Sequence, residues 1–217
     1  TLGKDAFQEV DITGIAMPIT KATYLVRDPQ TIPDVMRQAF AVAATGRPGP
    51  VLIDFLKNVT FPTTMIDYEF IPWKENRSCG SIRELNLRHG LKPPEPDLGD
   101  IDKLVEMIAQ SQRPLLMCGG GVVRGRADRQ FREFSEKLDC PVAITVMGGG
   151  GFPGAHPLTT GMVGMHGTQA SNIACANCDL LIAVGCRFSD RVALDPESFA
   201  SQAKIVQIDI DRAEIDK

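Results

Sequence analysis

Short apolar runs alternate with amphipathic segments along most of the chain. The apolar runs are bounded by glycine, proline or charged residues, and they predict strands at residues 18–26, 50–56, 114–120, 141–147, 179–185 and 203–210. Between them, apolar side chains recur every three or four positions and predict helices at residues 31–46, 100–108, 125–138 and 168–177. Strands that alternate with helices build a parallel sheet with helices on both faces. We therefore predict an α/β fold with an open parallel sheet.

Residues at the helix ends support these boundaries. Thr31 and Asp100 are expected to be N-caps, because their side-chain oxygens can accept hydrogen bonds from the free backbone N–H groups of a first turn. Gly46 is expected just after the first helix, since glycine adopts the left-handed conformation of a helix end most easily.

The pattern changes between residues 61 and 99. This segment is rich in proline and mixed charges and has weak periodicity, which is typical of a linker between domains. We therefore expect part of one α/β domain at residues 1–60, a linker at 61–99 and a second α/β domain at 100–217.

Composition narrows the class of protein. The chain has 217 residues, of which 43% are hydrophobic, and a formal net charge of −4. It can therefore form a core, but it lacks the basic surface that nucleic acids and anionic membranes require. No apolar run approaches the roughly 18 residues of a membrane span, and the first residues carry no signal-peptide pattern. We expect a soluble, cytoplasmic protein without a nucleic-acid or membrane partner.

The six cysteines do not have the spacing of a secreted disulfide framework. Cys175 and Cys178 form a C-x-x-C, but this pair lies at the end of a predicted helix and before a strand. Redox pairs usually follow a strand and open a helix, and a zinc site would need further ligands. We interpret the pair as small buried packing residues and predict no metal site in this chain.

Several predicted strands end in an unusual cluster of residues, most of them glycine, polar or charged. The clusters are Gly119–Gly121, Thr145–Met147 followed by Gly148–Gly151, Gly185–Arg187, and Asp209–Asp211. Ligands of open α/β sheets bind outside the carboxyl ends of the strands. The pattern therefore predicts a nucleotide site at this edge of the sheet.

Neither common nucleotide motif is complete. Arg124 stands where the third glycine of a G-x-G-x-x-G dinucleotide fingerprint belongs, no acid ends the next strand to bind a ribose, and a P-loop is absent. These observations argue against an NAD-dependent enzyme. The run Gly119–Gly121 can equally form a tight turn that packs a helix closely against the sheet.

The charged residues favour a ligand. Arg187 and Arg191 directly follow an apolar strand, and a guanidinium can pair two oxygens of a diphosphate. The alternative for either arginine is an ion pair with Asp190 or Asp195. Asp209 could accept hydrogen bonds from ribose hydroxyls.

A glycine-rich stretch at residues 145–168 joins two of these clusters. Within it, His166 is flanked by Gly164 and Gly167 and has little core around it, so its ring could stack on a ligand ring or hydrogen-bond to it. We interpret this stretch as a loop that lies against a ligand, with flexibility expected at residues 148–151.

Several motifs in order carry a resemblance to a known family. They are DAFQEVDITGIAMPITKATYLV, GRPGPVLID, GMVGMHGT, CDLLIAVGCRFSDRV and IDIDRAEIDK. The chain resembles acetohydroxyacid synthase, also called acetolactate synthase, the large catalytic subunit of the thiamine-diphosphate enzyme of branched-chain amino-acid biosynthesis. The resemblance covers nearly the whole chain apart from residues 61–99. It implies that residues 1–60 end a pyrimidine-binding domain and that 100–217 form most of a Rossmann-like central domain, which carries FAD with no net redox part in the reaction.

The resemblance also implies roles by position. Phe7 and Gln8 match residues in the active-site wall, and Lys57 matches the lysine at the mouth of the substrate channel. The residues that match FAD contacts are Arg47, Gly119, Gly120, Gly121, Thr145, Val146, Gly164, Met165, His166, Gly185, Arg187, Arg191 and Asp209. None of these residues is expected to be catalytic.

The chain departs from the family pattern at three places. It has LKNV at residues 56–59 where the family usually has PKDV, and MGGGGFPGAHP at 147–157 where MGLGAFPGTHP is common. It has Ser189 where the family usually has an acid, which removes one possible partner of Arg187 or Arg191.

Two motifs of the family are absent from the chain. They are the glutamate that activates thiamine diphosphate and the Gly-Asp-Gly motif that holds Mg²⁺ and the diphosphate. The resemblance therefore implies an internal fragment, with the thiamine diphosphate and Mg²⁺ sites mostly outside it and with no carboligase activity of its own.

The parent enzyme is expected to decarboxylate pyruvate and to join it to a second 2-ketoacid. We expect a homo-oligomer, a dimer or a tetramer, which a small regulatory subunit could join. Glyoxylate carboligase and a non-catalytic flavin-nucleotide-binding module remain alternatives. The PITK segment at residues 18–21 and Lys57 favour the synthase.

Overall fold

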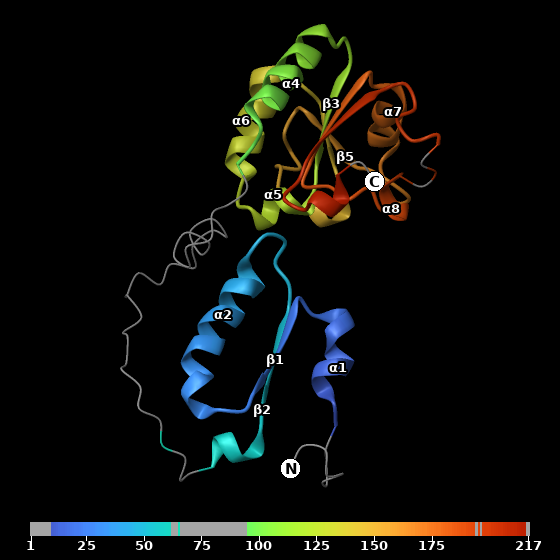
Figure 1. Cartoon of the computed structure of the whole chain (residues 1–217). Coiled ribbons are helices and arrows are strands. Elements are labelled where there is room, and N and C mark those ends of the chain that lie inside the picture. Colours follow the sequence, from blue (N-terminus) through green and yellow to red (C-terminus); the bar gives the residue numbers. More distant parts are fainter. Residues whose placement is uncertain (1–9, 62–64, 66–94, 194, 196, 216–217) are drawn as a thin grey trace. The chain divides into compact units, whose positions relative to one another are not determined.

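The computed structural model describes residues 10–61, 65, 95–193, 195 and 197–215. The chain divides into two compact units, which meet in the sequence at Pro93 and Pro94 (Figure 1). We call residues 1–93 unit 1 and residues 94–217 unit 2, and each is described by itself.

The described residues of unit 1 contain two parallel strands and two α-helices. Its elements are α1 (Ile12–Ala16), the 3-10 turn Met17–Ile19, β1 (Ala22–Val26), the 3-10 turn Pro29–Thr31, α2 (Ile32–Ala44), β2 (Val51–Phe55) and the 3-10 turn Lys57–Thr60. β1 and β2 pair along their whole lengths. The Nζ of Lys21 donates hydrogen bonds to the carbonyl oxygens of Val42 at 2.6 Å and Thr45 at 2.5 Å. The lysine of the PITK segment therefore caps the carboxyl end of α2.

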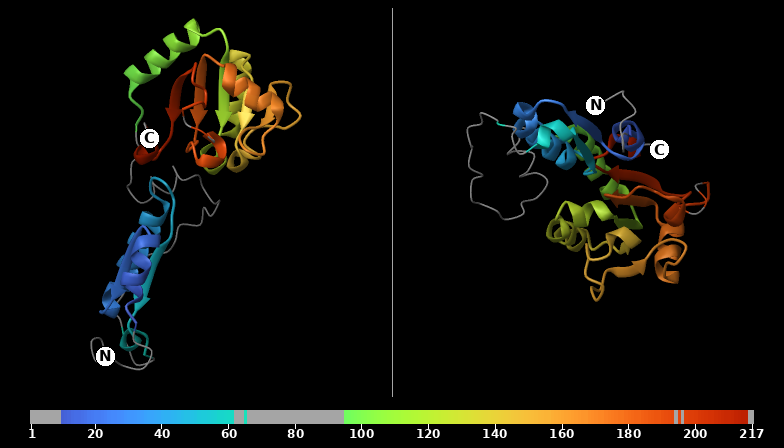
Figure 2. Two further views of the ribbon diagram at one scale, coloured as in Figure 1. Left: turned by 90° about the vertical axis from the view of Figure 1, so that its right-hand side faces the viewer. Right: turned by 90° about the horizontal axis from the view of Figure 1, so that it is seen from below.

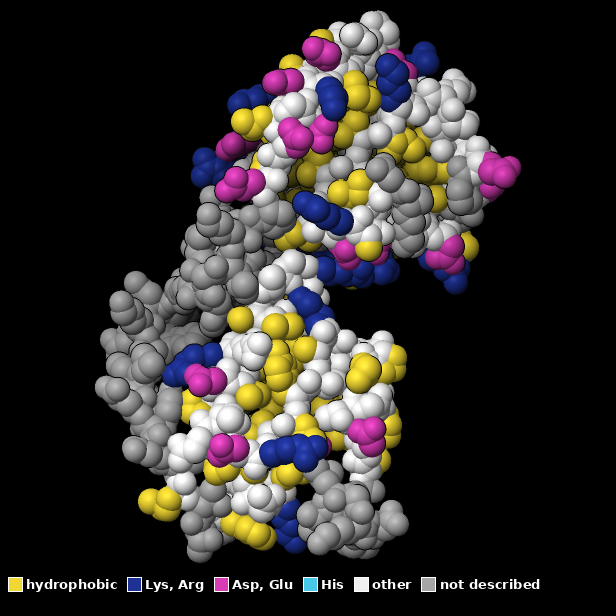
Figure 3. All heavy atoms as spheres, in the orientation of Figure 1, with side chains coloured by type: hydrophobic (Ala, Val, Ile, Leu, Met, Phe, Trp, Pro, Cys, Tyr) yellow, Lys and Arg dark blue, Asp and Glu magenta, His cyan; other side chains and the backbone are white. Residues whose placement is uncertain are grey.

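The core of unit 1 is small. Its buried apolar residues are Ala16, Val26, Ala39 and Val59. Larger apolar side chains are exposed, which Figure 3 shows on the visible face of unit 1, and they include Ile15, Met17, Ile19 and Phe40. A two-stranded sheet is marginally stable at best. The described residues of unit 1 therefore have a smaller sheet and a smaller buried core to stabilise them than those of unit 2.

Unit 2 is built on a five-stranded parallel sheet. The strands are β3 (Pro114–Cys118), β4 (Val142–Ile144), β5 (Thr159–Met162), β6 (Leu180–Val184) and β7 (Lys204–Ile208), in the order β5-β4-β3-β6-β7. All four neighbouring pairs are parallel. The predicted α/β class with an open parallel sheet is therefore confirmed.

Helices cover both faces of this sheet (Figures 1 and 2). They are α4 (Leu98–Gln110), α5 (Gly120–Arg124), α6 (Asp128–Leu138), α7 (Gln169–Asn177) and α8 (Asp190–Ala193), and a 3-10 turn follows β7 at Arg212–Glu214. Leu116 of β3 packs on the side of α4 and α6, with Phe131 in its cluster. Its neighbour Leu115 packs on the side of α7 and α8, with Cys175 in its cluster. Both faces are therefore apolar, as the strand composition predicts.

Several predicted boundaries are wrong by a few residues. The first strand begins at Ala22, because Pro18 lies in a 3-10 turn that precedes it. Asp97, rather than Asp100, caps α4 by accepting a hydrogen bond from the Gly99 N–H at 2.8 Å. Thr31 is the residue before α2 but makes no capping hydrogen bond. Gly46 follows α2 with a φ of +57°, as predicted.

The elements around the glycine-rich stretch also differ from the prediction. The fourth strand ends at Ile144, and Thr145 instead begins a 3-10 turn at Val146–Gly148. The segment 125–138 is helical only from Asp128, while a separate short helix, α5, precedes it. The edge strand β5 was not predicted. Its β-branched Thr159 and Thr160 were the available signal, but the surrounding glycines and prolines obscured it.

Asp179 ties the amino end of β6 to the amino end of β3. Its carboxylate accepts hydrogen bonds from the Ser111 hydroxyl, from the Gln112 N–H at 2.7 Å and from the Arg113 N–H at 3.0 Å. These hydrogen bonds lower the pKa of Asp179 to about 2, with the bond from Ser111 contributing most. The charged form of Asp179 therefore stabilises the folded state.

We expect Asp179→Asn to destabilise the protein at neutral pH and to remove part of its acid sensitivity. A carboxylate with a lowered pKa stabilises the fold above its unfolded pKa, near 3.8, and this contribution is lost as the pH falls through about 2. The difference between wild type and variant in urea-unfolding midpoint should shrink as the pH falls from about 4 to about 2. Asp102→Asn is the control, because it removes the same charge from an exposed side chain. A difference that stays constant with pH, or that Asp102→Asn reproduces, would contradict this role.

Candidate functional site

The direction in which the sheet grows reverses between β3 and β6. After β3 the chain adds β4 and β5 on one side, and it then crosses to the other side to add β6 and β7. Ligands of open α/β sheets bind at the carboxyl ends of the strands beside such a reversal. In unit 2 these ends carry Gly119–Gly121 and Gly185, at the end of the sheet where Figure 1 shows α5 and α8.

The glycines allow the two strand ends to contact each other. The Gly119 N–H donates to the Val184 carbonyl at 2.9 Å, and the Gly121 N–H donates to the Gly185 carbonyl at 3.0 Å. A Cβ on Gly121 would lie 2.5 Å from the Gly185 Cα, and a Cβ on Gly119 would collide with the Gly185 carbonyl. The interpretation of these glycines as close packing is therefore confirmed. Their contacts with a ligand remain a prediction.

Two of the four consecutive glycines at residues 148–151 have a similar packing role. Gly148 and Gly151 are buried, and a Cβ on either would lie 2.8 Å from an atom of Cys118. Thr145 joins the same contact, since its hydroxyl accepts from the Gly148 N–H at 3.1 Å and donates to the Cys118 carbonyl at 3.3 Å. The turn after β4 therefore packs against Cys118 at the end of β3.

An unpaired backbone donor marks this place as a candidate site. Gly120 is buried, and within the described part of the chain its N–H finds no hydrogen-bond acceptor. Buried N–H groups without a partner are rare. A Cβ on Gly120 would lie 3.0 Å from the Cβ of Met147, which is exposed together with Val146. The turn beside this strand end is thus exposed to solvent, and the strand-end residues fit the phosphate groups of a nucleotide.

The two predicted phosphate-binding arginines differ in their surroundings. Arg187 is exposed, and its guanidinium has no partner among the residues that the structure describes. Arg191 is also exposed, and its Nε lies 3.7 Å from the Asp190 carboxylate. The alternative ion pair with Asp190 is therefore present, but exposed pairs of this kind contribute little to stability. Both side chains remain accessible to an anion.

Residues 164–166 form a turn that packs against Arg191 of α8. Gly164 has a φ of +105°, and a Cβ there would collide with the Arg191 carbonyl. The Met165 N–H donates to the same carbonyl at 3.0 Å, and the Arg191 Nη1 lies 3.3 Å from the Met165 Sδ. The turn thus joins the end of β5 to α8 and leaves His166 exposed, with no hydrogen bond to the described residues.

Asn172 is a positioning residue that the sequence analysis missed. Its Oδ1 accepts from the Gly164 N–H at 3.0 Å, and its Nδ2 donates to the Gly164 carbonyl at 3.1 Å. Both backbone groups of the left-handed glycine are therefore held by one side chain of α7. The available signal was an asparagine in the first turn of the helix that directly follows the GMVGMHGT motif.

Asp209 follows the last strand, as predicted. Its Oδ1 accepts a hydrogen bond from the Asp211 N–H at 2.9 Å, which leaves the second oxygen for another donor. The Gly185 N–H donates to the carbonyl of Ile208, the residue before it, at 2.8 Å. Asp209 therefore lies at the same edge of the sheet as Gly185 and Arg187.

Four of the predicted site residues belong to unit 1. Phe7 and Gln8 lie outside the described residues. Lys57 opens the 3-10 turn directly after β2, and Arg47 follows Gly46 after α2.

The C-x-x-C pair is packing, as predicted. Cys175 and Cys178 are both buried, and burial raises the pKa of Cys175 to about 12 and that of Cys178 to about 11. Such thiols are poor nucleophiles at neutral pH. Among the described residues, no group of three or more His, Cys, Asp or Glu side chains is placed to bind a metal ion.

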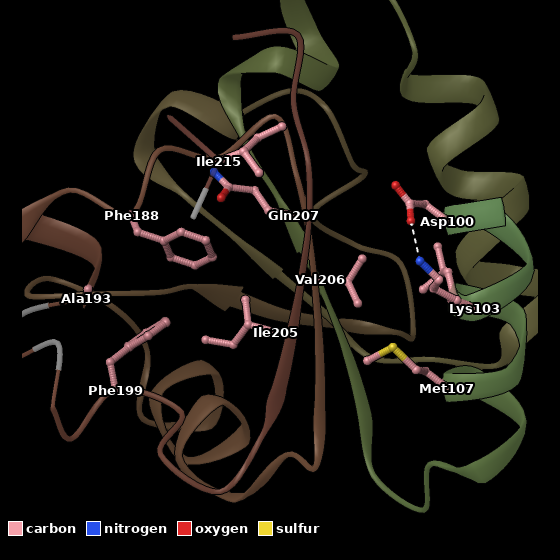
Figure 4. A pocket seen from close by; sticks show the side chains of 11 residues that line it. Asp100, Lys103, Met107, Phe188, Ala193, Phe199, Ile205, Val206, Gln207 and Ile215 are labelled. Carbon is pink, nitrogen blue, oxygen red and sulfur yellow. Dashed lines mark hydrogen bonds and ion pairs between the residues drawn. The ribbon is translucent and has the colours of Figure 1, made fainter. Parts of the chain in front are cut away.

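A hollow of about 620 Å³ lies along β7, away from the glycines (Figure 4). Phe188 and Phe199 lie on one side of this strand, and Met107 and the Asp100–Lys103 ion pair of α4 lie on the other. β7 pairs only with β6, so the hollow is the open edge of the sheet. We assign it no role in ligand binding.

The architecture defines the class of protein. A parallel sheet with helices on both faces and a reversal of strand order is a doubly wound α/β fold, the architecture of many nucleotide-binding domains. No helix within the described ranges has both the length and the apolar character needed to span a membrane.

Comparison with known proteins places the chain in a family. Residues 101–217 match the family model described as thiamine pyrophosphate enzyme, central domain. The chain therefore belongs to the thiamine pyrophosphate enzyme family, which confirms the resemblance inferred from its motifs.

Relatives match the whole chain. It is similar to the probable acetolactate synthase large subunit of Methanocaldococcus jannaschii, with 46% identity over 100% of the chain and 35% of the relative. It is 45% identical to the acetolactate synthase of Arthrospira platensis and 42% identical to the large subunit from Corynebacterium glutamicum, and it covers 36% and 32% of these two proteins. The chain thus spans about a third of the length of the relatives that it matches.

Proposed function

We propose that this chain is part of an acetolactate synthase, which decarboxylates pyruvate and condenses it with a second 2-ketoacid. The observation that carries this proposal is the similarity to proteins named acetolactate synthase over the whole length of the chain, including residues outside the family match. Unit 1 is proposed to be the end of the pyrimidine-binding domain, and unit 2 the FAD-binding central domain.

Unit 2 is proposed to hold FAD at the carboxyl edge of its sheet. The orphaned Gly120 N–H and the strand ends at Gly121 and Gly185 fit a diphosphate, and Arg187 and Arg191 supply accessible positive charge. Asp209 has one carboxylate oxygen left for a ribose hydroxyl. The turn at residues 164–166 presents His166 and Met165 to the flavin, and Thr145 and Val146 complete the proposed contacts from unit 2. FAD would serve here as a structural cofactor.

The active-site residues of this chain are proposed to shape a cavity rather than to transfer protons. Thiamine diphosphate, held with Mg²⁺ mostly by residues outside this chain, supplies the electron sink for decarboxylation. Phe7 and Gln8 would line the wall of the cavity and Lys57 its entrance. Their task is to orient the second 2-ketoacid and to keep water away from the reactive carbon.

We also propose a setting for the parent protein. It is cytoplasmic and homo-oligomeric, a dimer or a tetramer, and a small regulatory subunit joins it. The relatives' description as large subunits supports the last point. The exposed apolar side chains of unit 1 supply a surface that other protein must cover.

A flavin and activity assay tests this function. We expect the purified 217-residue chain to retain flavin absorption after incubation with FAD and gel filtration, and to form no acetolactate from pyruvate with thiamine diphosphate and Mg²⁺. The full-length protein should form acetolactate and should not convert glyoxylate alone, which separates the synthase from glyoxylate carboligase. A chain that binds no FAD contradicts the proposed role of unit 2. A full-length protein without pyruvate condensation contradicts the proposed activity.

A further inference from the structure

Arg124 lies at the end of α5 without an ion pair to any of the described residues. It is the last residue of α5 and is exposed, and the described residues offer its guanidinium no hydrogen-bond or ion-pair partner. An arginine in the last turn of a helix gains a few tenths of a kcal/mol from the helix dipole. That small gain does not fix the conformation of the side chain.

The helix directs this side chain back toward the end of β3, because helical side chains point toward the residue four positions earlier, which here is Gly120. The Arg124 Nη2 lies 3.1 Å from the position that a Cβ on Gly120 would occupy. Met147, on the 3-10 turn after β4, lies 3.0 Å from the same position. One guanidinium nitrogen therefore lies close to Gly120, whose buried N–H also has no acceptor among the described residues.

Positive charge thus approaches the reversal point of the sheet from both sides. Arg124 belongs to the segment after β3, and Arg187 to the segment after β6. Figure 3 shows Lys and Arg side chains at this end of unit 2, with Asp and Glu side chains among them. Among the described residues neither Arg124 nor Arg187 forms an ion pair with an acidic side chain, and Asp190 lies beside Arg191 instead. Guanidinium groups in the segments that follow two neighbouring strands match a ligand with two negatively charged groups.

We propose that Arg124 binds the diphosphate of the dinucleotide together with Arg187, so that one guanidinium approaches from each side of the reversal point. This inference rests on the proposed FAD site and adds to it a residue that occupies the position of the third fingerprint glycine. A planar guanidinium pairs two phosphate oxygens at once, which an ammonium group cannot do. Arg124 therefore supplies the contact that a glycine-rich phosphate loop would supply through its backbone.

Binding of FAD to variants of the 217-residue chain tests this proposal. Flavin fluorescence titrations should show that Arg124→Ala weakens FAD binding about tenfold to a hundredfold, the range expected for a charge-assisted hydrogen bond. Arg124→Lys should fall between wild type and Arg124→Ala. Inorganic diphosphate should displace FAD from the wild type, and it should compete less well, by a similar factor, for Arg124→Ala.

Arg129→Ala is the matched control. It removes the same charge from the next helix, where Arg129 already pairs with Glu133 at 2.9 Å, and FAD binding should change less than about twofold. The thermal midpoint of Arg124→Ala should equal that of the wild type, which excludes a folding defect. Equal FAD affinity in wild type and Arg124→Ala overturns the role of Arg124 but leaves the FAD site intact. A wild-type chain that binds no FAD overturns the proposed FAD site and this inference with it.

Discussion

Gly185→Ala is expected to destabilise unit 2 by about 2–5 kcal/mol. Two effects add at this position. Gly185 has a φ of +61°, where a side chain costs about 1–2 kcal/mol, and a Cβ would lie 2.7 Å from the backbone nitrogen of Gly121. Neither backbone can move freely, because the Gly121 N–H donates to the Gly185 carbonyl. Since whole domains are stable by only about 5–15 kcal/mol, this single methyl group can remove much of the stability.

Substitutions at two other glycines separate the cost of the positive φ from the cost of the steric clash. Gly150→Ala changes a residue with a φ of +90° and nothing within 4 Å of the added Cβ, so only the backbone term of about 1–2 kcal/mol should appear. Gly154→Ala meets neither a positive φ nor a neighbour, so its effect should stay within about 0.5 kcal/mol. Urea unfolding followed by circular dichroism measures all three. Equal effects for Gly185→Ala and Gly150→Ala would show that the strand ends do not touch as described.

Leu115→Ala and Leu116→Ala should each destabilise the protein by about 2–5 kcal/mol. These neighbours of β3 point to opposite faces of the sheet, and both are buried, with 1% and 0% of their surfaces exposed. In a sheet with one solvated face only one of two adjacent positions would be sensitive. Leu98→Ala on α4, where the leucine is 73% exposed, is the control and should change the free energy of unfolding by less than about 0.5 kcal/mol. A large difference between Leu115→Ala and Leu116→Ala would argue that one layer of helices does not pack as described.

The fold class could be predicted from the sequence because the apolar pattern of each strand and helix is set by residues that are close together in the chain. The run PLLMC can be apolar at every position only in a strand that is covered on both faces, and it forms the central strand β3. The cap of α4 was misplaced because Asp97 and Asp100 are both suitable acceptors, and only the backbone path selects Asp97. The edge strand β5 was missed because its pairing with β4, rather than its own sequence, makes it a strand.

The candidate site was predicted in part. The clusters of glycine and charge lie at one edge of the sheet, since parallel strands all end there, and ligand binding at this edge stays a prediction. The sequence could not distinguish a glycine that approaches a ligand from one that approaches another strand, because both need the same missing Cβ. Asn172 and Arg124 were not predicted as site residues, since their importance depends on contacts with Gly164 and Gly120 across the fold.

By itself, therefore, the sequence determined the class of fold and the family, because periodicity and motifs are local properties. Only the tertiary structure decided how the glycines are used. Gly121 and Gly185 allow two strand ends to touch, and Gly148 and Gly151 allow a turn to pack against Cys118. The N–H of Gly120 has no acceptor within the described part of the chain. These differences arise from contacts between residues far apart in the chain, which no local pattern records.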